Sequence, residues 1–218
     1  MDINTAKGFG CIGVVFKVGV GNNDEATNYD GKLSQIHGYV VALEDAHESI
    51  GAWGYRTQDV PGITNITSLS KDNSDPYNGY TNTKAVRGLS EYATTDVNHP
   101  YDLPKQYWAF KVAVEYNEQA ATPAESSGWY LPSIQQLKDI TTNTDLPTCI
   151  TAAGGVDYKR STRYWSSSEY SDKDAWFCTL GNNSVTPESY AKSNDNGEDF
   201  GSWIPTLSGG YVRSILTF

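Results

Sequence analysis

The fold depends on one stretch, Gly128-Trp129-Tyr130-Leu131-Pro132-Ser133, which lies just past the middle of the chain. Ser133 is followed three positions later by Gln136, and this capping-box pattern marks the N-terminus of a helix. The helix predicted from it covers residues 134–141. Its apolar side chains fall on one side at helical spacing, as expected of a core helix: Ile134, Leu137 and Ile140.

Before this stretch, apolar runs alternate with polar loops. Two runs have the composition of strands and cover residues 12–20 and 38–43. Residues 51–80 are polar and rich in turn formers, so we expect a long irregular segment anchored by Trp53 and Tyr55. Two amphipathic helices are predicted next, over residues 82–92 and 106–116.

The last third of the chain is predicted to be mainly β-structure. Three strand candidates carry aromatic and β-branched residues and cover residues 164–168, 175–180 and 211–218. Trp165 and Trp176 lie within these candidates, and we expect both in the core. Short strands, two or three helices and long ordered loops together indicate an α+β fold.

Length and composition indicate a single domain over residues 1–218. Its N-terminal strands and helices occupy residues 1–127, and the motif-bearing part occupies residues 128–218. A chain of 218 residues can bury a core without disulfides or a metal. Hydrophobic residues make up 38%, and 15 Tyr and 6 Trp supply much of that share, which favours strands and ordered loops over a helical bundle.

The net charge of −10 restricts the partners that we expect. An acidic surface repels nucleic-acid phosphates and anionic lipids, so we expect no nucleic-acid binding and no membrane insertion. No apolar run approaches the roughly 20 residues of a membrane-spanning helix, and no signal peptide is recognisable. The composition fits an extracellular protein that binds a protein or a glycan, although simple solubility is the more common meaning of such a charge.

Three cysteines are present, and an odd number is not a disulfide framework. Cys149 and Cys178 could pair, and their spacing leaves this open. Cys11 begins an apolar run and is expected to be a buried free thiol. No histidine stands near a cysteine at a metal-binding spacing.

The sequence contains none of the common catalytic motifs. Its three histidines are scattered, and Ser166-Ser167-Ser168 is a serine run in a strand rather than a nucleophile elbow. We therefore expect no enzymatic activity and no cofactor. Residues 72–79 and 194–199 offer oxygen ligands for calcium, but neither segment has an EF-hand spacing and both have the composition of ordinary turns.

Several motifs together give the chain a resemblance to a known family. The stretch 128–133, followed by Leu137, resembles the GW-x-LPS…L motif of bacterial and phage C-type-lectin-like domains. The segments that match the rest of that pattern are 164–170, 175–176 and 211–218, and those that resemble its N-terminal strands are 13–16 and 37–46. The group includes fimbrillin-associated surface domains and DUF1566-type proteins, and the likeness spans nearly the whole chain.

The resemblance implies a C-type-lectin-like fold with a binding surface near its C-terminus. Several members of the group are variable proteins of diversity-generating retroelements, in which the altered side chains lie on an exposed face of a fixed scaffold. Trp165, Trp176 and the strand at 211–218 would be scaffold. The residues expected to be exposed, ligand-binding and open to variation are Glu169, Tyr170, Asp172, Asp174, Asn182, Asn183 and Tyr190.

One segment departs from the family pattern. Between Tyr190 and Tyr211 the chain carries an extra stretch, which either enlarges the binding surface or covers it. Asn194 and Trp203 in this stretch are further ligand-binding candidates, and Trp203 could equally be a loop anchor tucked into the core. The calcium-binding signatures of animal lectins are missing, so the resemblance implies no calcium-mediated sugar binding.

These observations favour a non-enzymatic ligand-binding module, an adhesin or receptor-binding domain on a bacterial surface or a phage particle. The alternative is a structural pilus or tail-fibre subunit without a ligand site of its own. An enzyme on the same scaffold is a third hypothesis, since formylglycine-generating enzymes share the broad fold, and Cys178 is the one cysteine in the matching third of the chain. The first hypothesis predicts mostly exposed side chains over residues 169–190, and the second predicts an exposed strand edge or self-association surface.

Overall fold

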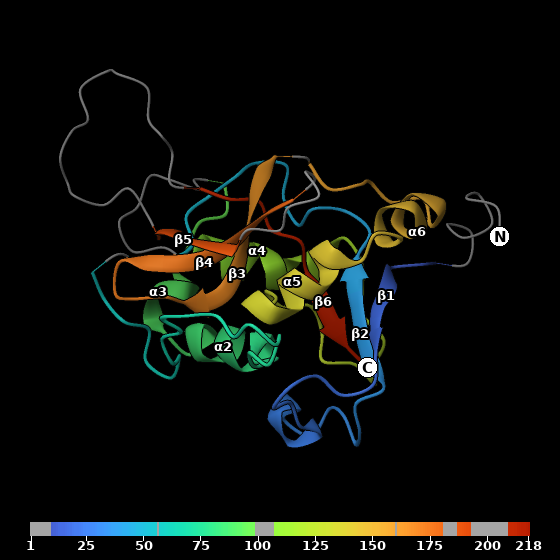
Figure 1. Ribbon diagram of the computed structural model, residues 1–218, viewed down its shortest axis with the longest axis horizontal. Coiled ribbons are helices and arrows are strands. Elements are labelled where there is room, and N and C mark those ends of the chain that lie inside the picture. The colour runs from blue at the N-terminus through green and yellow to red at the C-terminus, as the bar shows by residue number, and fades with distance from the viewer. Residues whose placement is uncertain (1–9, 56, 99–106, 160, 181–186, 193–208) are drawn as a thin grey trace.

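Two small antiparallel sheets organise the part of the chain that the computed structural model describes, namely residues 10–55, 57–98, 107–159, 161–180, 187–192 and 209–218. The first sheet has the strand order β1-β2-β6 and the second has the order β3-β4-β5. Helices and long loops surround both sheets (Figure 1). This is the α+β arrangement of short antiparallel sheets that the sequence predicts.

The first sheet brings together the early part of the chain and its C-terminal end (Figure 1). β1 (Gly13–Val18) pairs antiparallel with β2 (Gly38–Ala42), and β2 pairs antiparallel with β6 (Ile215–Thr217). The carbonyl of Phe218 accepts a hydrogen bond from the amide of His37 at 2.6 Å. β2 is therefore the central strand, which explains why its residues are largely buried.

The second sheet contains β3 (Thr162–Glu169), β4 (Asp174–Leu180) and β5 (Pro187–Ala191). Trp165 of β3 stands opposite Phe177 of β4. Their buried rings meet edge to face, with centroids 6.2 Å apart and planes at 87°. The two strands predicted for this region are confirmed, and β5 is a further strand that the sequence did not predict.

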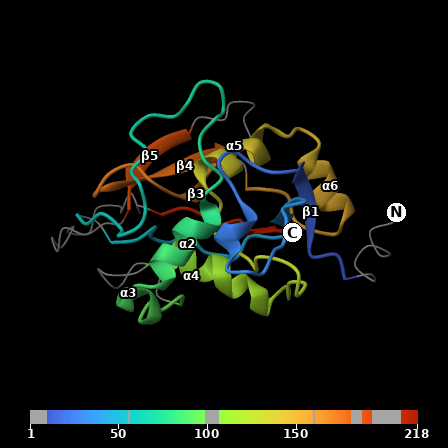
Figure 2. The same ribbon diagram turned by 90° about the horizontal axis from the view of Figure 1, so that it is seen from below.

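Helices cover the sheets from several sides. The helices, including two 3-10 turns marked η, are η1 (Ala26–Tyr29), α2 (Gly79–Arg87), α3 (Ser90–Ala93), α4 (Trp108–Glu115), η2 (Tyr116–Glu118), α5 (Ile134–Thr142) and α6 (Leu146–Ala152). α5 packs against β3 and β4, and α2 packs against β3. α2 and α4 lie side by side on one side of the second sheet (Figure 2).

α5 forms as its capping box predicts. The Ser133 hydroxyl accepts from the amide of Gln136 at 3.4 Å, and the Gln136 side chain accepts from the amide of Ser133 at 2.8 Å. These bonds satisfy backbone amides that have no partner within the helix. The apolar positions of the predicted stripe are all buried: Ile134, Leu137 and Ile140.

Buried indoles fasten the irregular segment 51–80 to the second sheet. Trp53 donates from its indole nitrogen to the carbonyl of Ser166 at 2.6 Å. Trp176 of β4 donates from its indole nitrogen to the carbonyl of Ile66 in the irregular segment at 2.7 Å. The predicted anchor is thus confirmed for Trp53. The core positions expected for two tryptophans are confirmed as well: Trp165 and Trp176.

Two predicted elements differ in extent from the observed ones. The helix predicted over 82–92 begins earlier as α2 and is interrupted at Gly88, after which the short α3 follows. The strand predicted over 211–218 shortens to β6, because Tyr211 forms an isolated parallel bridge with Tyr164 of the other sheet. The end of the chain therefore crosses from one sheet to the other, which hydrophobic alternation cannot show.

The three cysteines are free, so the pairing of Cys149 with Cys178 does not occur in this structure. Cys178 is buried, and this burial raises the pKa of its thiol. Cys149 is exposed, and Cys11 is half-buried rather than fully buried as expected. Within the described ranges, none of the helices combines the length and apolar character that crossing a bilayer requires.

Candidate functional site

The expected binding surface begins where β3 ends, at Glu169. The expectation that Glu169 is exposed is wrong, because its side chain is 0% accessible. Its carboxylate forms an ion pair with the ammonium group of Lys192, which is also 0% accessible. The partner lies 23 positions away, and no local pattern points to it.

The Glu169–Lys192 pair is enclosed by backbone groups. Both carboxylate oxygens accept from the amide of Val60, at 3.1 and 3.2 Å. The ammonium group donates to the carbonyls of Gln58 at 3.1 Å and Asp172 at 3.2 Å. Burial raises the pKa of Glu169 and lowers that of Lys192, and their mutual contact opposes both shifts. The pair holds the 58–60 segment against the second sheet and is closed to a ligand.

The turn after β3 and the first position of β4 carry three more predicted residues, and all are half-buried. The ring of Tyr170 meets that of Trp176 edge to face, with centroids 5.4 Å apart. The amide of Tyr170 donates to the carbonyl of Asp174 at 3.0 Å, and the carbonyl of Asp172 accepts from the amide of Thr57 at 2.8 Å. The turn is therefore tied to its surroundings and exposes only part of each side chain.

The remaining predicted binding residues lie where the structure describes no side chain. The backbone of Tyr190 belongs to β5 and pairs with Ala175, but its side chain is not among those described. Four further predicted residues lie outside the described residues altogether: Asn182, Asn183, Asn194 and Trp203. Among the described side chains, the structure brings four of the predicted residues together where β3 ends and β4 begins: Glu169, Tyr170, Asp172 and Asp174.

The serine run of β3 joins helices to the sheet. All three serines are 0% accessible. Ser166 donates from its hydroxyl to a carbonyl of β4 at 2.8 Å, and Ser168 accepts from the amide of Ile134 at 3.0 Å. The carbonyl of Ser167 accepts from the side chain of Asn82 at 3.1 Å. These groups contact α5 and α2 rather than an open cleft.

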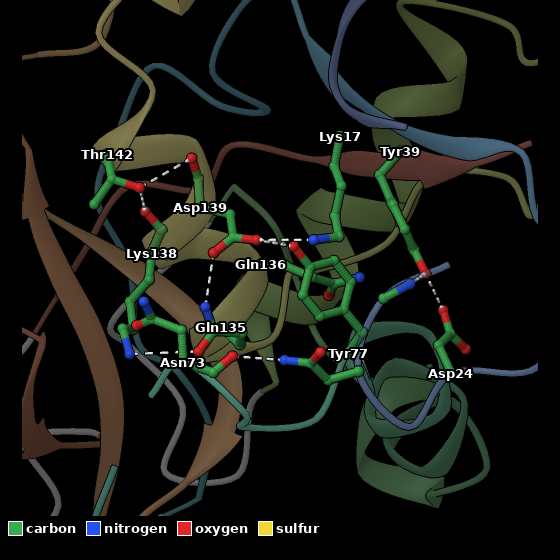
Figure 3. A network of polar contacts seen from close by, with 12 residues as sticks. Lys17, Asp24, Tyr39, Asn73, Tyr77, Gln135, Gln136, Lys138, Asp139 and Thr142 are labelled. Atoms are coloured by element: carbon green, nitrogen blue, oxygen red, sulfur yellow. Dashed lines mark hydrogen bonds and ion pairs between the residues drawn. The ribbon is translucent and has the colours of Figure 1, made fainter. Parts of the chain in front are cut away.

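A buried carboxylate organises the loop after β1. One oxygen of Asp24 accepts from the hydroxyls of Tyr29 at 2.6 Å and Tyr39 at 2.7 Å. The Tyr39 hydroxyl in turn accepts from the amide of Gly21 at 2.9 Å, and Figure 3 shows Asp24 and Tyr39 in contact. Burial and then the Asp24 contact raise the pKa of Tyr39, while burial is the largest cause of the raised pKa of Tyr29.

Asp139 on α5 is the centre of a neighbouring cluster (Figure 3). It accepts from the hydroxyl of Tyr77, and it accepts from the amide group of Gln135 at 2.7 Å. The ammonium group of Lys17 on β1 lies 3.5 Å from the same carboxylate. The cluster links β1, α5 and the loop that precedes α2.

The candidate calcium segment 72–79 directs its buried carboxylate inward. Both oxygens of Asp75 accept from the amide of Ser70 at 3.1 Å, and the Lys138 ammonium lies 3.8 Å away. Across the described residues, no group of three or more His, Cys, Asp or Glu is arranged to hold a metal ion. The second candidate segment, 194–199, lies outside the described residues.

A second interior ion pair joins Arg213 to Asp45, and no motif pointed to it. The Arg213 Nε atom lies 2.9 Å from the carboxylate, and the same guanidinium donates to the carbonyl of Val156 at 3.1 Å. Burial raises the pKa of Asp45, and the charge of Arg213 opposes that shift. A single charged residue in a terminal run of aromatic, aliphatic and hydroxyl side chains was the available signal, since buried charges need partners. Like the pair at Glu169, this one ties loops to sheets.

Comparisons with known proteins link the fold to one solved structure. No protein-family model and no curated protein matches the chain. The chain is similar in structure to a fimbrial protein from Bacteroides ovatus, with a TM-score of 0.61 and 17% sequence identity. The similarity covers 95% of this chain and 44% of that protein, so the chain spans less than half of its neighbour's length. At this identity the likeness shows a shared fold.

Proposed function

We propose that the chain is a domain of a fimbrial surface protein and acts there as a rigid, non-enzymatic structural subunit. The observation that carries the proposal is the fold shared with a Bacteroides fimbrial protein across 95% of the chain. The coverage of 44% of that protein fits one domain within a larger subunit. The buried ion pairs and indole anchors support rigidity, because they fix long loops onto the two sheets.

The proposal includes a C-type-lectin-like fold. It is supported by β1 and β6, which come from opposite ends of the chain and flank β2 in one sheet. It is also supported by the long segment 43–78, which contains no helix or strand within its described residues and packs onto the second sheet through Trp53 and Trp176. Both features suit a domain that presents ordered loops on a small core.

The edge of the first sheet supports a structural role in a fibre. β1 pairs with β2 on one side, and no other strand of the described residues pairs with it. Three valines on or just after this strand are exposed, Val15 by 45%, Val18 by 82% and Val20 by 58%. Apolar side chains on a sheet edge are a means of contact between subunits. A bulge near Val15 bends the strand, so we expect contact through side chains more than through a continuous ladder.

Immunogold electron microscopy of the cells that produce the protein tests this proposal. Antibodies against the chain should label surface filaments along their length. Label confined to filament tips would instead favour an adhesin that binds a host or bacterial protein or glycan. Cells without labelled filaments would overturn the fimbrial assignment.

The edge contact has its own matched pair of variants. Val20→Asp should reduce filament assembly, whereas Val156→Asp, at a position that is also 58% exposed, should not. If both variants assemble into filaments equally well, the exposed edge at β1 does not take part in contacts between subunits.

The retroelement hypothesis has a separate test in the neighbouring DNA. A near-repeat of the 3′ end of the gene beside a reverse-transcriptase gene would support it, and a genome that lacks both would rule it out. Because Glu169 is buried, diversified positions would have to begin at Tyr170 or later.

A further inference from the structure

A hollow of about 400 Å³ lies between α2, the end of α4 with η2, and the segment 127–130. This volume falls within the range of small-molecule sites in proteins. The hollow is far in sequence from the residues predicted to bind a ligand. It goes beyond the proposed structural role, which needs no small-molecule site.

One wall of the hollow is basic. α2 contributes one face to it through positions spaced by three and four residues: Tyr80, Thr83, Lys84 and Arg87. Lys32 joins this wall from the loop after η1, where its ammonium donates to the carbonyl of Ser127 at 2.8 Å. Lys84 is neutralised by an ion pair with Asp30.

Lys32 and Arg87 form a pair of like charges in this wall. Burial lowers the pKa of Lys32, and the charge of Arg87 lowers it further, against a smaller opposing effect of Asp30. Among the described residues, Arg87 makes no ion pair, and its side chain is exposed. In a chain with a net charge of −10, two cations that line the same hollow without an ion-pair partner among its described lining residues favour the binding of an anion.

The wall formed by the end of α4 and by η2 is acidic. Glu115 is half-buried and Glu118 is exposed, and both line the hollow. Burial raises the pKa of Glu115, the charge of Lys111 at 4.0 Å opposes that shift, and the charge of Glu118 adds to it by a smaller amount. These carboxylates accept hydrogen bonds and repel a second anion. A ligand that suits both walls therefore carries one anionic group and several hydrogen-bond donors.

The floor of the hollow is fixed in advance. Trp129 is almost fully buried and donates from its indole to the carbonyl of Ala120 at 2.6 Å. The Tyr130 hydroxyl lies 2.7 Å from the hydroxyl of Thr217 on β6. A floor held in this way loses little conformational entropy when a ligand binds, which favours affinity.

We propose that this hollow binds a carboxylated sugar residue of the uronic-acid type. Its carboxylate lies between Lys32 and Arg87, and its hydroxyl groups donate to Glu115 and Glu118. A neutral sugar would leave the two cations uncompensated. A phosphate dianion or a dicarboxylate would meet the acidic wall.

Isothermal titration calorimetry of the whole chain with glucuronate, glucose and glutamate tests the assignment. We expect glucuronate to bind and glucose to bind at least about ten-fold more weakly, since a charge-assisted hydrogen bond contributes that much. Binding of glucuronate should weaken as salt is added. Absence of glucuronate binding, or equal binding of glucose, would overturn the proposal. Stronger binding of glutamate would overturn the choice of a sugar.

Arg87→Gln locates the binding within the hollow. We expect this variant to weaken glucuronate binding by about ten-fold or more, and Lys71→Gln, an exposed cation outside the hollow, to leave it unchanged. A thermal melt equal to that of the unmodified chain would show that the variant remains folded. If both variants bind glucuronate alike, the hollow is not the site. The filament-labelling result is independent of this one, because it does not measure sugar binding.

Discussion

Two charged regions of this molecule, the end of β3 and the hollow beside α2, use their charges in opposite ways. At the end of β3, Glu169 and Lys192 contact each other, and both are 0% accessible. In the hollow, Lys32 and Arg87 carry like charges and line open space. Opposite charges enclosed together hold a fold, whereas like charges left at the surface can be neutralised by a ligand. Pairing, rather than composition, distinguishes the charges that hold the fold together from the charges that stay open.

The largest expected effect comes from breaking the enclosed pair. Glu169→Leu leaves the Lys192 ammonium buried without a counter-charge and the amide of Val60 without its acceptor. We expect the free energy of unfolding to fall by about 3–5 kcal/mol, measured by urea denaturation. Glu118→Gln in the open hollow should change it by less than about 0.5 kcal/mol. If both changes lowered the free energy of unfolding equally, the enclosed pair would not stabilise the fold more than the open hollow does.

A double variant separates the charge from the packing at the same place. Glu169→Leu combined with Lys192→Met removes both charges, so most of the stability lost in the single variant should return. A double variant as unstable as the single one would mean that the pair matters for its hydrogen bonds to backbone groups.

The enclosed tyrosines make the interior sensitive to alkali. Burial raises the pKa values of Tyr29, Tyr39 and Tyr77 above the ordinary value of 10.0. The folded state therefore keeps protons that the unfolded chain loses, so their contribution is complete below pH 10 and is lost as the pH rises further. Each tyrosine should cost about 1.4 kcal/mol of unfolding free energy per pH unit in that range.

Circular dichroism and tyrosinate absorbance in an alkaline titration measure this effect. The share of the tyrosinate absorbance that belongs to these tyrosines should appear together with the loss of the circular dichroism signal, since they ionise on unfolding. Tyr29→Phe should reduce the slope of unfolding free energy against pH by the contribution of one tyrosine, about 1.4 kcal/mol per pH unit. Tyrosinate absorbance that rises fully before the structure is lost would contradict the enclosed state of these side chains.

A smaller effect is expected at the start of α5, a local feature that belongs to neither charged region. Ser133→Ala removes the acceptor for the amide of Gln136 and should lower the free energy of unfolding by about 1 kcal/mol. Thr142→Ala, at the exposed end of the same helix, is the matched control and should not destabilise the fold. A larger loss at Thr142 would show that the cap is not what fixes the helix.

The smallest effect tests the open hollow directly. Because the charge of Arg87 lowers the pKa of Lys32, Arg87→Gln should raise that pKa toward its ordinary value of 10.5. The pKa can be followed by NMR titration of the lysine side chain. The control Lys71→Gln should leave it in place, and a pKa that does not respond to Arg87 would mean that the two cations are not neighbours.

Much of the scaffold could be predicted from the sequence, and the candidate sites could not. The capping box at Ser133 and the strand around Trp165 were readable because their signals lie within a few residues. The burial of Glu169 was missed because a glutamate after a serine run at a strand end is typical of a surface. The hollow was missed because α2, the end of α4 and residues 127–130 each look ordinary alone.

By itself, the sequence determined the local elements and the core aromatics, since capping, periodicity and apolar character act over a few positions. Only the tertiary structure decided which charges are enclosed and which are open. Lys192 reaches Glu169 across 23 positions because β5 returns beside β4 at the end of β3. Lys32 and Arg87 line one hollow because η1 packs on α2 and Asp30, just after η1, pairs with Lys84 of that helix. The strength of a charge interaction depends on distance and on exclusion of water, and folding sets both.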